Sequence, residues 1–178
     1  QTVTTLEGGQ LEIDLDGGAA VNGTSIVATD IETENGVIHL IDGVLLESLD
    51  IVQRAIATPA TSTLVDAVVA GDLVGTLQGD GPFTVFAPTN DAFSAIPAEV
   101  LGRLLDPANQ VILQKVLTYH VIAGEVRAGD LVDGATPTTV AGSTVTIDLD
   151  GGPKVNGANI IATDIETENG VIHLIDGV

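Results

Sequence analysis

Two pairs of aspartates have the spacing of calcium ligands. The pattern Asp-Leu-Asp-Gly occurs at residues 14–17 and again at residues 148–151. Alternate carboxylates of this kind open calcium-binding loops, which also require a bidentate glutamate at the twelfth position of the loop. Ser25 holds that position after the first pattern and Asn159 holds it after the second. We therefore interpret both segments as hairpin turns and expect no dedicated cofactor, with weak calcium binding by surface carboxylates left open.

Histidine and serine are the side chains that could supply a general base and a nucleophile. His39 and His173 occupy equivalent positions in two copies of one segment, so a single domain holds only two distinct histidines, in different motifs. No Gly-x-Ser-x-Gly sequence surrounds Ser94, although that sequence is what exposes the nucleophile in one large class of hydrolases. The chain also lacks cysteine, which excludes a thiolate nucleophile and disulfide bonds. We expect no catalytic residues and no enzyme activity.

The charge of the chain limits its partners. Aspartate and glutamate number 25 against 5 lysines and arginines, which gives a formal charge of −20. Such a surface cannot neutralise nucleic-acid phosphates and is repelled by anionic membranes. Each apolar run is also interrupted before it reaches the roughly 18 residues that a membrane span requires. We therefore expect neither a nucleic-acid partner nor membrane insertion.

A long internal repeat determines which elements position these residues. Residues 11–44 return with few substitutions as residues 145–178, at an offset of 134 residues. This period is far longer than the roughly 20 to 50 residues of solenoid units and matches a whole domain. The C-terminal part of the repeating unit therefore occurs twice, and the N-terminal part, roughly residues 48–137, occurs once. Because the copies differ in sequence, they are separate repeats within one polypeptide.

The pattern of apolar residues predicts strands in the repeated part and helices in the single-copy part. Alternating apolar residues and turn-forming Asp-Gly-Gly and Asn-Gly sequences predict strands over residues 145–149, 155–162 and 171–175. Apolar residues at helical spacing predict helices over residues 64–77, with Thr63 as the N-cap and a break at Gly71, and over residues 97–105 and 109–117. An apolar run at residues 83–87 predicts a buried strand. Helices grouped ahead of strands indicate an α+β fold.

Three motifs in this order resemble the signatures of the fasciclin domain. Residues 84–93, Thr-Val-Phe-Ala-Pro-Thr-Asn-Asp-Ala-Phe, resemble its first motif, and Tyr119-His120 resembles its central tyrosine-histidine motif. Residues 159–165 with residues 169–176 resemble its second long motif. Three ordered motifs within one domain length make a chance match a poor explanation.

The resemblance covers essentially the whole chain. Residues 48–178 resemble one nearly complete domain that lacks its last strand, and residues 1–47 resemble the C-terminal half of a preceding domain. It implies a fasciclin-like wedge-shaped β-sandwich with several helices packed at one end. Family members are typically secreted or anchored at the cell surface, often in tandem, and are associated with cell adhesion and matrix assembly.

The resemblance also points to candidate binding residues. The tyrosine-histidine pair has been proposed as a binding determinant, and an Asp-Ile pair has been proposed to bind integrins in animal matrix members of the family. The matching residues here are Tyr119, His120, Asp164, Ile165, Asp30 and Ile31. Each pair has a structural alternative. Tyr119-His120 can end a helix and pack into the core with His120 hydrogen-bonded, and the aspartates can satisfy backbone donors in a local turn.

The expected function is that of an extracellular structural and adhesive module. Its partners would be neighbouring copies or adjacent repeats and cell-surface or matrix components. The alternative is a ligand-binding module for calcium, polysaccharide or lipid, although an aromatic content of 2% offers few platforms for stacking sugars.

A half-domain built of strands must be covered by something. Without helices, residues 1–47 would expose an apolar sheet face and unpaired edges. The cover is either an upstream half in a longer array or residues 48–137 in a permuted domain. Since each chain offers two C-terminal halves and one N-terminal half, head-to-tail swapping cannot pair every half. We favour a longer array, with assembly into filaments as a hypothesis.

Overall fold

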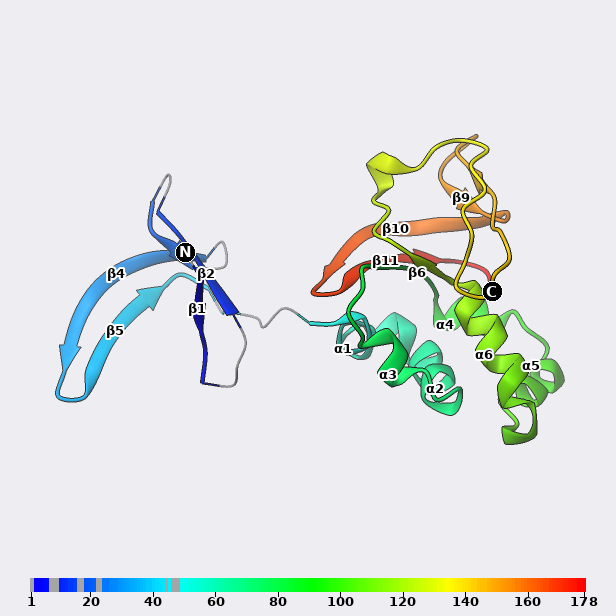
Figure 1. Cartoon of the computed structure of the whole chain (residues 1–178), viewed down its shortest axis with the longest axis horizontal. Coiled ribbons are helices and arrows are strands. Elements are labelled where there is room, and N and C mark those ends of the chain that lie inside the picture. Colours follow the sequence, from blue (N-terminus) through cyan, green and yellow to red (C-terminus); the bar gives the residue numbers. More distant parts are fainter. Residues whose placement is uncertain (1, 7–9, 16–17, 22–23, 44, 46–48) are drawn as a thin grey trace. The chain divides into compact units, whose positions relative to one another are not determined.

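The chain divides into two units, Gln1–Ser48 and Leu49–Val178, in a computed structural model (Figure 1). The structure describes residues 2–6, 10–15, 18–21, 24–43, 45 and 49–178. Asp16 and Gly17, which belong to the first Asp-Leu-Asp-Gly pattern, lie outside the described residues.

The described part of the first unit is a five-stranded antiparallel sheet. Its strand order is β1-β2-β3-β4-β5. The strands are β1 (Thr2–Thr4), β2 (Gln10–Asp14), β3 (Ala20–Val21), β4 (Thr24–Thr33) and β5 (Gly36–Ile41). Strand β5 is an edge strand, and all of its residues are exposed except the last, Ile41, which is half-buried.

The second unit contains a six-stranded sheet of order β7-β6-β11-β10-β9-β8. The strands are β6 (Phe83–Pro88), β7 (Val121–Ala123), β8 (Ile147–Asp148), β9 (Lys154–Val155), β10 (Ala158–Thr167) and β11 (Gly170–Ile175). Strands β6 and β11 pair in parallel, and every other pair is antiparallel. The predicted hairpin at Asp-Gly-Gly is confirmed because it joins β8 to β9.

The helices of the second unit gather on one side of β6 and β11, as Figure 1 shows. They are α1 (Ile51–Ala57), α2 (Ser62–Ala70), α3 (Val74–Leu77), α4 (Asn90–Ser94), α5 (Ala98–Leu104) and α6 (Gln110–Tyr119). The break at Gly71 is confirmed, but α2 begins before the predicted N-cap Thr63, with Thr61 at that position. Sheet and helices together confirm the α+β fold.

Alternation along β6 separates two apolar cores, because successive side chains of a strand point to opposite faces. Val85 and Ala87 pack with the helices, where they meet Leu117 of α6. Phe86, between them, packs on the other face with residues of every remaining strand of the sheet, including Ile147 of β8. Strands from both ends of the sheet therefore enclose one core, which requires the sheet to curve over Phe86.

The two copies of the repeat pair in the same register. In the first unit Glu32 lies opposite Val37, and in the second unit Glu166 lies opposite Val171. Both long hairpins also have register shifts at the same positions. The difference lies beyond the hairpin, since β11 has β6 as its outer neighbour whereas β5 ends its sheet.

Asn169, in the turn between β10 and β11, fastens that hairpin to the helical part of the second unit. Its Oδ1 accepts a hydrogen bond from the N–H of Ile51 (3.0 Å), the first residue of α1. Its Nδ2 donates to the carbonyls of Leu77 (2.7 Å) and Gly79 (3.0 Å) at the end of α3. A single amide therefore satisfies backbone groups at two helix ends.

We predict that Asn169→Ala lowers the free energy of unfolding of the second unit by about 1–3 kcal/mol, because it leaves half-buried backbone groups unpaired. Urea denaturation followed by fluorescence of Tyr119, the single tyrosine in a chain without tryptophan, measures this unit alone. Asn35→Ala is the matched control, since Asn35 is the exposed counterpart in the first unit. Equal effects of the two substitutions would contradict the anchoring role.

Candidate functional site

Tyr119 and His120 lie at the C-terminal end of α6. The Tyr119 hydroxyl donates to the carbonyl of Thr144 (3.0 Å) and accepts from Nδ2 of Asn156 (2.7 Å). Asn156 stands in the predicted Asn-Gly turn and has a positive φ of 48°. Tyr119 thus ties the helix to the segment before β8 and to the turn between β9 and β10.

His120 follows the helix as its C-cap. Its Nδ1 lies 2.8 Å from the carbonyl of Val116 and so carries the proton that it donates. Burial lowers the pKa of His120, and the bond to Val116 opposes this effect only in part. Both members of the pair therefore make the helix-end contacts that the structural interpretation predicts, and their binding role stays a prediction.

An open apolar groove of about 520 Å³ lies beside this pair. Val111 and Ile112 of α6 are exposed at its margin. Its polar groups include Lys115, Tyr119 and Asn156. The apolar walls include Phe86, Val116, Val145, Val155, Ile175 and Val178. Such a groove suits an apolar side chain or an acyl chain better than a charged ligand.

Asp164 lies in a bulge of β10, with a positive φ of 56°. Its carboxylate accepts a hydrogen bond from the N–H of Ala128 (2.8 Å), which lies far away in the sequence. The expected local-turn role is therefore wrong for Asp164, and Thr167 is the residue that closes the hairpin turn, through a 2.7 Å bond to Gly170. Ile165 is half-buried and packs against the core under the helices.

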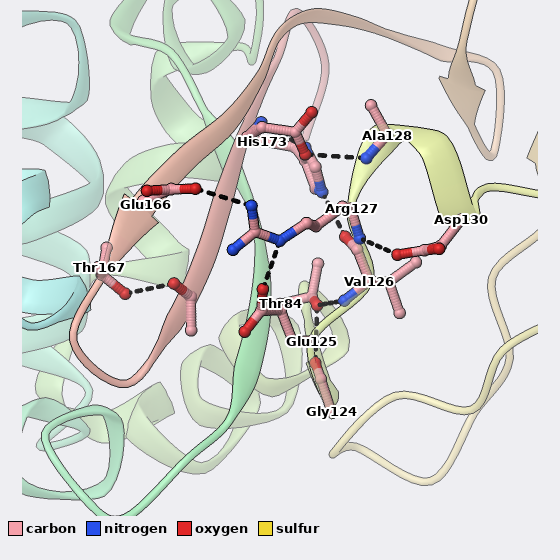
Figure 2. Close-up of polar contacts among 12 residues, drawn as sticks. Thr84, Gly124, Glu125, Val126, Arg127, Ala128, Asp130, Glu166, Thr167 and His173 are labelled. Atoms are coloured by element: carbon pink, nitrogen blue, oxygen red, sulfur yellow. Dashed lines mark hydrogen bonds and ion pairs between the residues drawn. The ribbon is translucent and has the colours of Figure 1, made fainter. Parts of the chain in front are cut away.

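Figure 2 shows that the segment from Gly124 to Asp130 is held against the sheet through its backbone. The Thr84 hydroxyl donates to the carbonyl of Gly124 (2.7 Å) and accepts from the N–H of Val126 (2.8 Å). Nε2 of His173 lies 2.8 Å from the carbonyl of Val126. The N–H of Asp164 donates to Nδ1 of the same ring (3.3 Å), so the ring proton is on Nε2. Both ring nitrogens of His173 are therefore hydrogen-bonded to backbone groups.

Arg127 lies in the same segment and bridges two carboxylates. Its Nε lies 2.6 Å from Oε1 of Glu125, and its Nη1 lies 2.7 Å from Oε1 of Glu166 on β10. Hydrogen bonds and charge attraction from Glu125 and then Glu166 raise the pKa of Arg127. The pairs are exposed, so their net contribution to stability is small.

The first unit repeats the aspartate-histidine geometry on an exposed surface. Asp30 has a positive φ of 58°, and its N–H donates to Nδ1 of His39 (3.4 Å). Ile31, Asp30 and His39 are all exposed. The Asp30-Ile31 and Asp164-Ile165 pairs therefore have the same backbone but different surroundings.

The residues considered for calcium and for catalysis take part in local structure. Asp148 accepts a hydrogen bond from the N–H of Asp150 (2.8 Å) and lies 3.7 Å from the ammonium of Lys154. The Ser94 hydroxyl donates to the carbonyl of Asn90 in α4 (2.8 Å). Among the residues that the structure describes, no group of three or more His, Asp or Glu side chains is placed to hold a metal ion. Weak calcium binding stays an untested prediction.

The polar contacts of Thr84, Val126 and Arg127 were not found by sequence reasoning. The contacts of Val126 with Thr84 (2.8 Å) and of Arg127 with Glu166 join residues about forty positions apart. One sequence feature could have indicated these contacts. The same histidine occurs in both copies of the repeat, as His39 and His173, which indicates that it has a structural role in each copy. Nor is any helix among the described residues both long and apolar enough to cross a bilayer.

A family model described as the fasciclin domain matches residues 1–47 and 59–178. Protein sll1483 of Synechocystis sp. is 41% identical over 162 residues, which cover 90% of this chain and 89% of that protein. The transforming growth factor-beta-induced protein ig-h3 of Sus scrofa is 38% identical over 160 residues, which cover 88% of this chain and 23% of that protein.

A solved structure of a FAS1 domain pair from the insect cell adhesion molecule Fasciclin I has the same fold. The TM-score is 0.67 at 18% sequence identity, and the match covers 94% of this chain and 66% of that chain. At this identity the likeness concerns the fold.

We predict that the second unit loses stability as the pH falls below 6.5, the ordinary pKa of histidine. The lowered pKa of His120 means that the unfolded chain takes up this proton first, so acid favours unfolding until the pH reaches the folded value. The loss from this group is at most about 1.4 kcal/mol at a pH one unit below the ordinary pKa.

Urea denaturation followed by Tyr119 fluorescence at about pH 7.5 and about pH 5.5 measures the effect. His120→Asn should flatten the dependence, whereas His39→Asn, which alters an exposed ring in the first unit, should leave it intact. An unchanged pH dependence in His120→Asn would refute the assignment.

Proposed function

The chain belongs to the fasciclin domain family, and from that premise we propose that it is an extracellular structural and adhesive module that acts through its surfaces rather than by catalysis. The observation that carries the proposal is the match of the fasciclin domain model to residues 1–47 and 59–178, and the apolar groove beside Tyr119 and His120 is the surface that we propose for the contact. The domain pair of known structure that has the same fold comes from the insect cell adhesion molecule Fasciclin I.

The groove has the composition of a protein contact surface. Its walls are mostly apolar, and polar groups such as Lys115 and Asn156 stand among them. Val111 and Ile112 are exposed on one helix face at its margin. Apolar patches with polar margins are typical of surfaces that bind other proteins. We propose that a neighbouring protein surface fills the groove.

The same proposal places the chain within a tandem array. The whole-domain repeat and the common register of its two copies support this. In that arrangement the first unit is the C-terminal half of one domain and residues 48–178 are the next domain. Neighbouring repeats and copies are then the first partners, and assembly into filaments is one outcome. A charge of −20 makes neighbouring chains repel one another. Because salt screens this repulsion, contacts between copies should strengthen as the salt concentration rises.

A second candidate function, lipid binding, is favoured by the same groove. A volume of about 520 Å³ lies within the range of small-molecule sites. The apolar walls suit an acyl chain better than a sugar or a calcium ion.

We predict that beads coated with the chain aggregate and that Ile112→Asp slows this aggregation roughly tenfold or more, because it buries an unpaired charge in the contact. Val69→Asp is the matched control, since Val69 is an exposed apolar residue of α2 that does not line the groove. Absence of aggregation in the unmodified chain, or equal slowing by both substitutions, would count against adhesion through the groove.

Titration with a fluorescent fatty acid tests the lipid alternative. Saturable binding that Ile112→Asp abolishes and Val69→Asp preserves is the expected outcome if the groove holds an acyl chain. A signal that rises linearly without saturation would rule this alternative out.

A further inference from the structure

A cavity of about 50 Å³ lies within the second unit, between the helices and the sheet. The helices that line it, α1, α2, α3 and α6, lie on one side of β6 and β11, which line it from the other side (Figure 1). The cavity is distinct from the groove beside Tyr119, because the two share only His120 among the described residues that line them.

Aliphatic side chains make up most of the cavity wall. Val52 of α1, Leu64 and Val68 of α2 and Val85 of β6 line it, and each is at most 7% exposed. Ala55 of α1 and Ala87 of β6 contribute only a methyl group each. Larger side chains hold the helices and the sheet apart, and the small ones between them leave space that closely packed cores do not have.

A second void in the helical layer shows that this space is local. It measures about 10 Å³ and is lined by Phe93, Leu104 and Leu113 together with their neighbours on α4, α5 and α6. Even one water needs roughly 10–15 Å³. The helices are therefore closely packed in that region, and the room for a ligand is confined to the side of α1, α2 and α3.

The polar residues of the cavity wall are Thr76, Thr118 and His120. The Thr118 hydroxyl donates to the carbonyl of Gln114 (2.7 Å), and Nδ1 of His120 donates to the carbonyl of Val116 (2.8 Å). Within residues 49–178, all of which the structure describes, no Asp, Glu, Lys or Arg lines the cavity. A buried water needs about two to four polar partners, and few free groups are present here. The wall therefore favours an uncharged apolar occupant.

We propose that this cavity is a binding site for a compact, uncharged apolar molecule of the hydrocarbon class. A volume of about 50 Å³ is several times what one water requires, and it fits a molecule of roughly three to five carbon atoms. It is too small for a protein side-chain cluster or a long acyl chain. The site is separate from the groove, so the inference goes beyond the proposed adhesion and does not rest on it.

Entry to the cavity does not require global unfolding. Thr76 of α3 and Val140 line the cavity and are exposed. Helix α3 (Val74–Leu77) is only four residues long, so few backbone hydrogen bonds oppose its displacement. Local opening of such a segment costs less free energy than unfolding of the whole unit.

Methyl NMR with cyclopentane as the probe tests the proposal. We expect saturable shifts of the methyl resonances of Leu64, Leu73 and Val121, which line the cavity. Val111 and Val155, which line the groove, should keep their resonances. Absence of saturable shifts would overturn the proposal, and so would shifts confined to the groove.

Tetrahydrofuran is the matched control ligand, because its ring has the same size but contains one oxygen atom. It should bind at least roughly tenfold more weakly than cyclopentane, since burial in an apolar wall removes the hydrogen bonds that water makes to its oxygen. Equal affinities of the two rings would contradict an apolar site.

Two substitutions of the same kind test the position of the site. Ala55→Val adds two carbon atoms to the cavity wall and should weaken cyclopentane binding at least roughly tenfold, because it fills the space that the ligand needs. Ala98→Val makes the same change at an exposed position of α5 and should preserve binding. Equal weakening in both variants would refute the assignment of the site to this cavity.

Urea denaturation followed by Tyr119 fluorescence checks that the space exists. Ala55→Val should have a urea midpoint no lower than that of Ala98→Val, because both carry the helix-propensity cost of valine and the cavity accommodates the added carbons. A clearly lower midpoint, or failure of Ala55→Val to fold, would show an overpacked wall and would overturn the proposal.

Discussion

The second unit depends on the parallel pairing of β6 with β11, which joins parts of the chain that are distant in sequence. Because Val85 and Phe86 of β6 point to opposite faces, this one strand takes part in both cores. The first unit shows what the hairpin does without it. Register and bulges are retained, but the apolar side chains of β5 stay exposed. Hairpin geometry is therefore encoded locally, whereas burial requires the N-terminal part of the domain.

The polar side chains at the fasciclin motifs organise the backbone. Three of these side chains are hydrogen-bonded to distant backbone groups: Asp164 to the N–H of Ala128, His173 to the carbonyl of Val126, and Tyr119 to the carbonyl of Thr144. Because the polar atoms of these side chains are already hydrogen-bonded to the backbone, a partner at the neighbouring surface would be recognised mainly by shape and by apolar contact. The groove next to α6 has both properties, which is why we assign the proposed function to contact rather than chemistry.

Sequence patterns located several elements where the signal was local, but the predicted strand over residues 155–162 is wrong, because the turn at Asn156-Gly157 separates β9 from β10 and β10 continues to Thr167. Apolar spacing located α5 and α6, and Asp-Gly-Gly located the hairpin between β8 and β9. The role of Asp164 was misjudged because its partner, Ala128, is distant in sequence and periodicity carries no information about such contacts. The groove was missed for the same reason, since α6 and the segments around Val145 and Asn156 form it only in the folded chain.

The central claim is that pairing with β6 determines whether the outer strand of the hairpin is buried. Residues 36–41 and 170–175 have identical sequences, so this claim can be tested within one molecule. Intrinsic exchange rates are the same for identical sequences, so any difference in amide exchange by NMR reports structure alone. The account predicts slow exchange in β11, at the rate of global unfolding of the second unit, and fast exchange in β5. Equal protection of the two strands would contradict it.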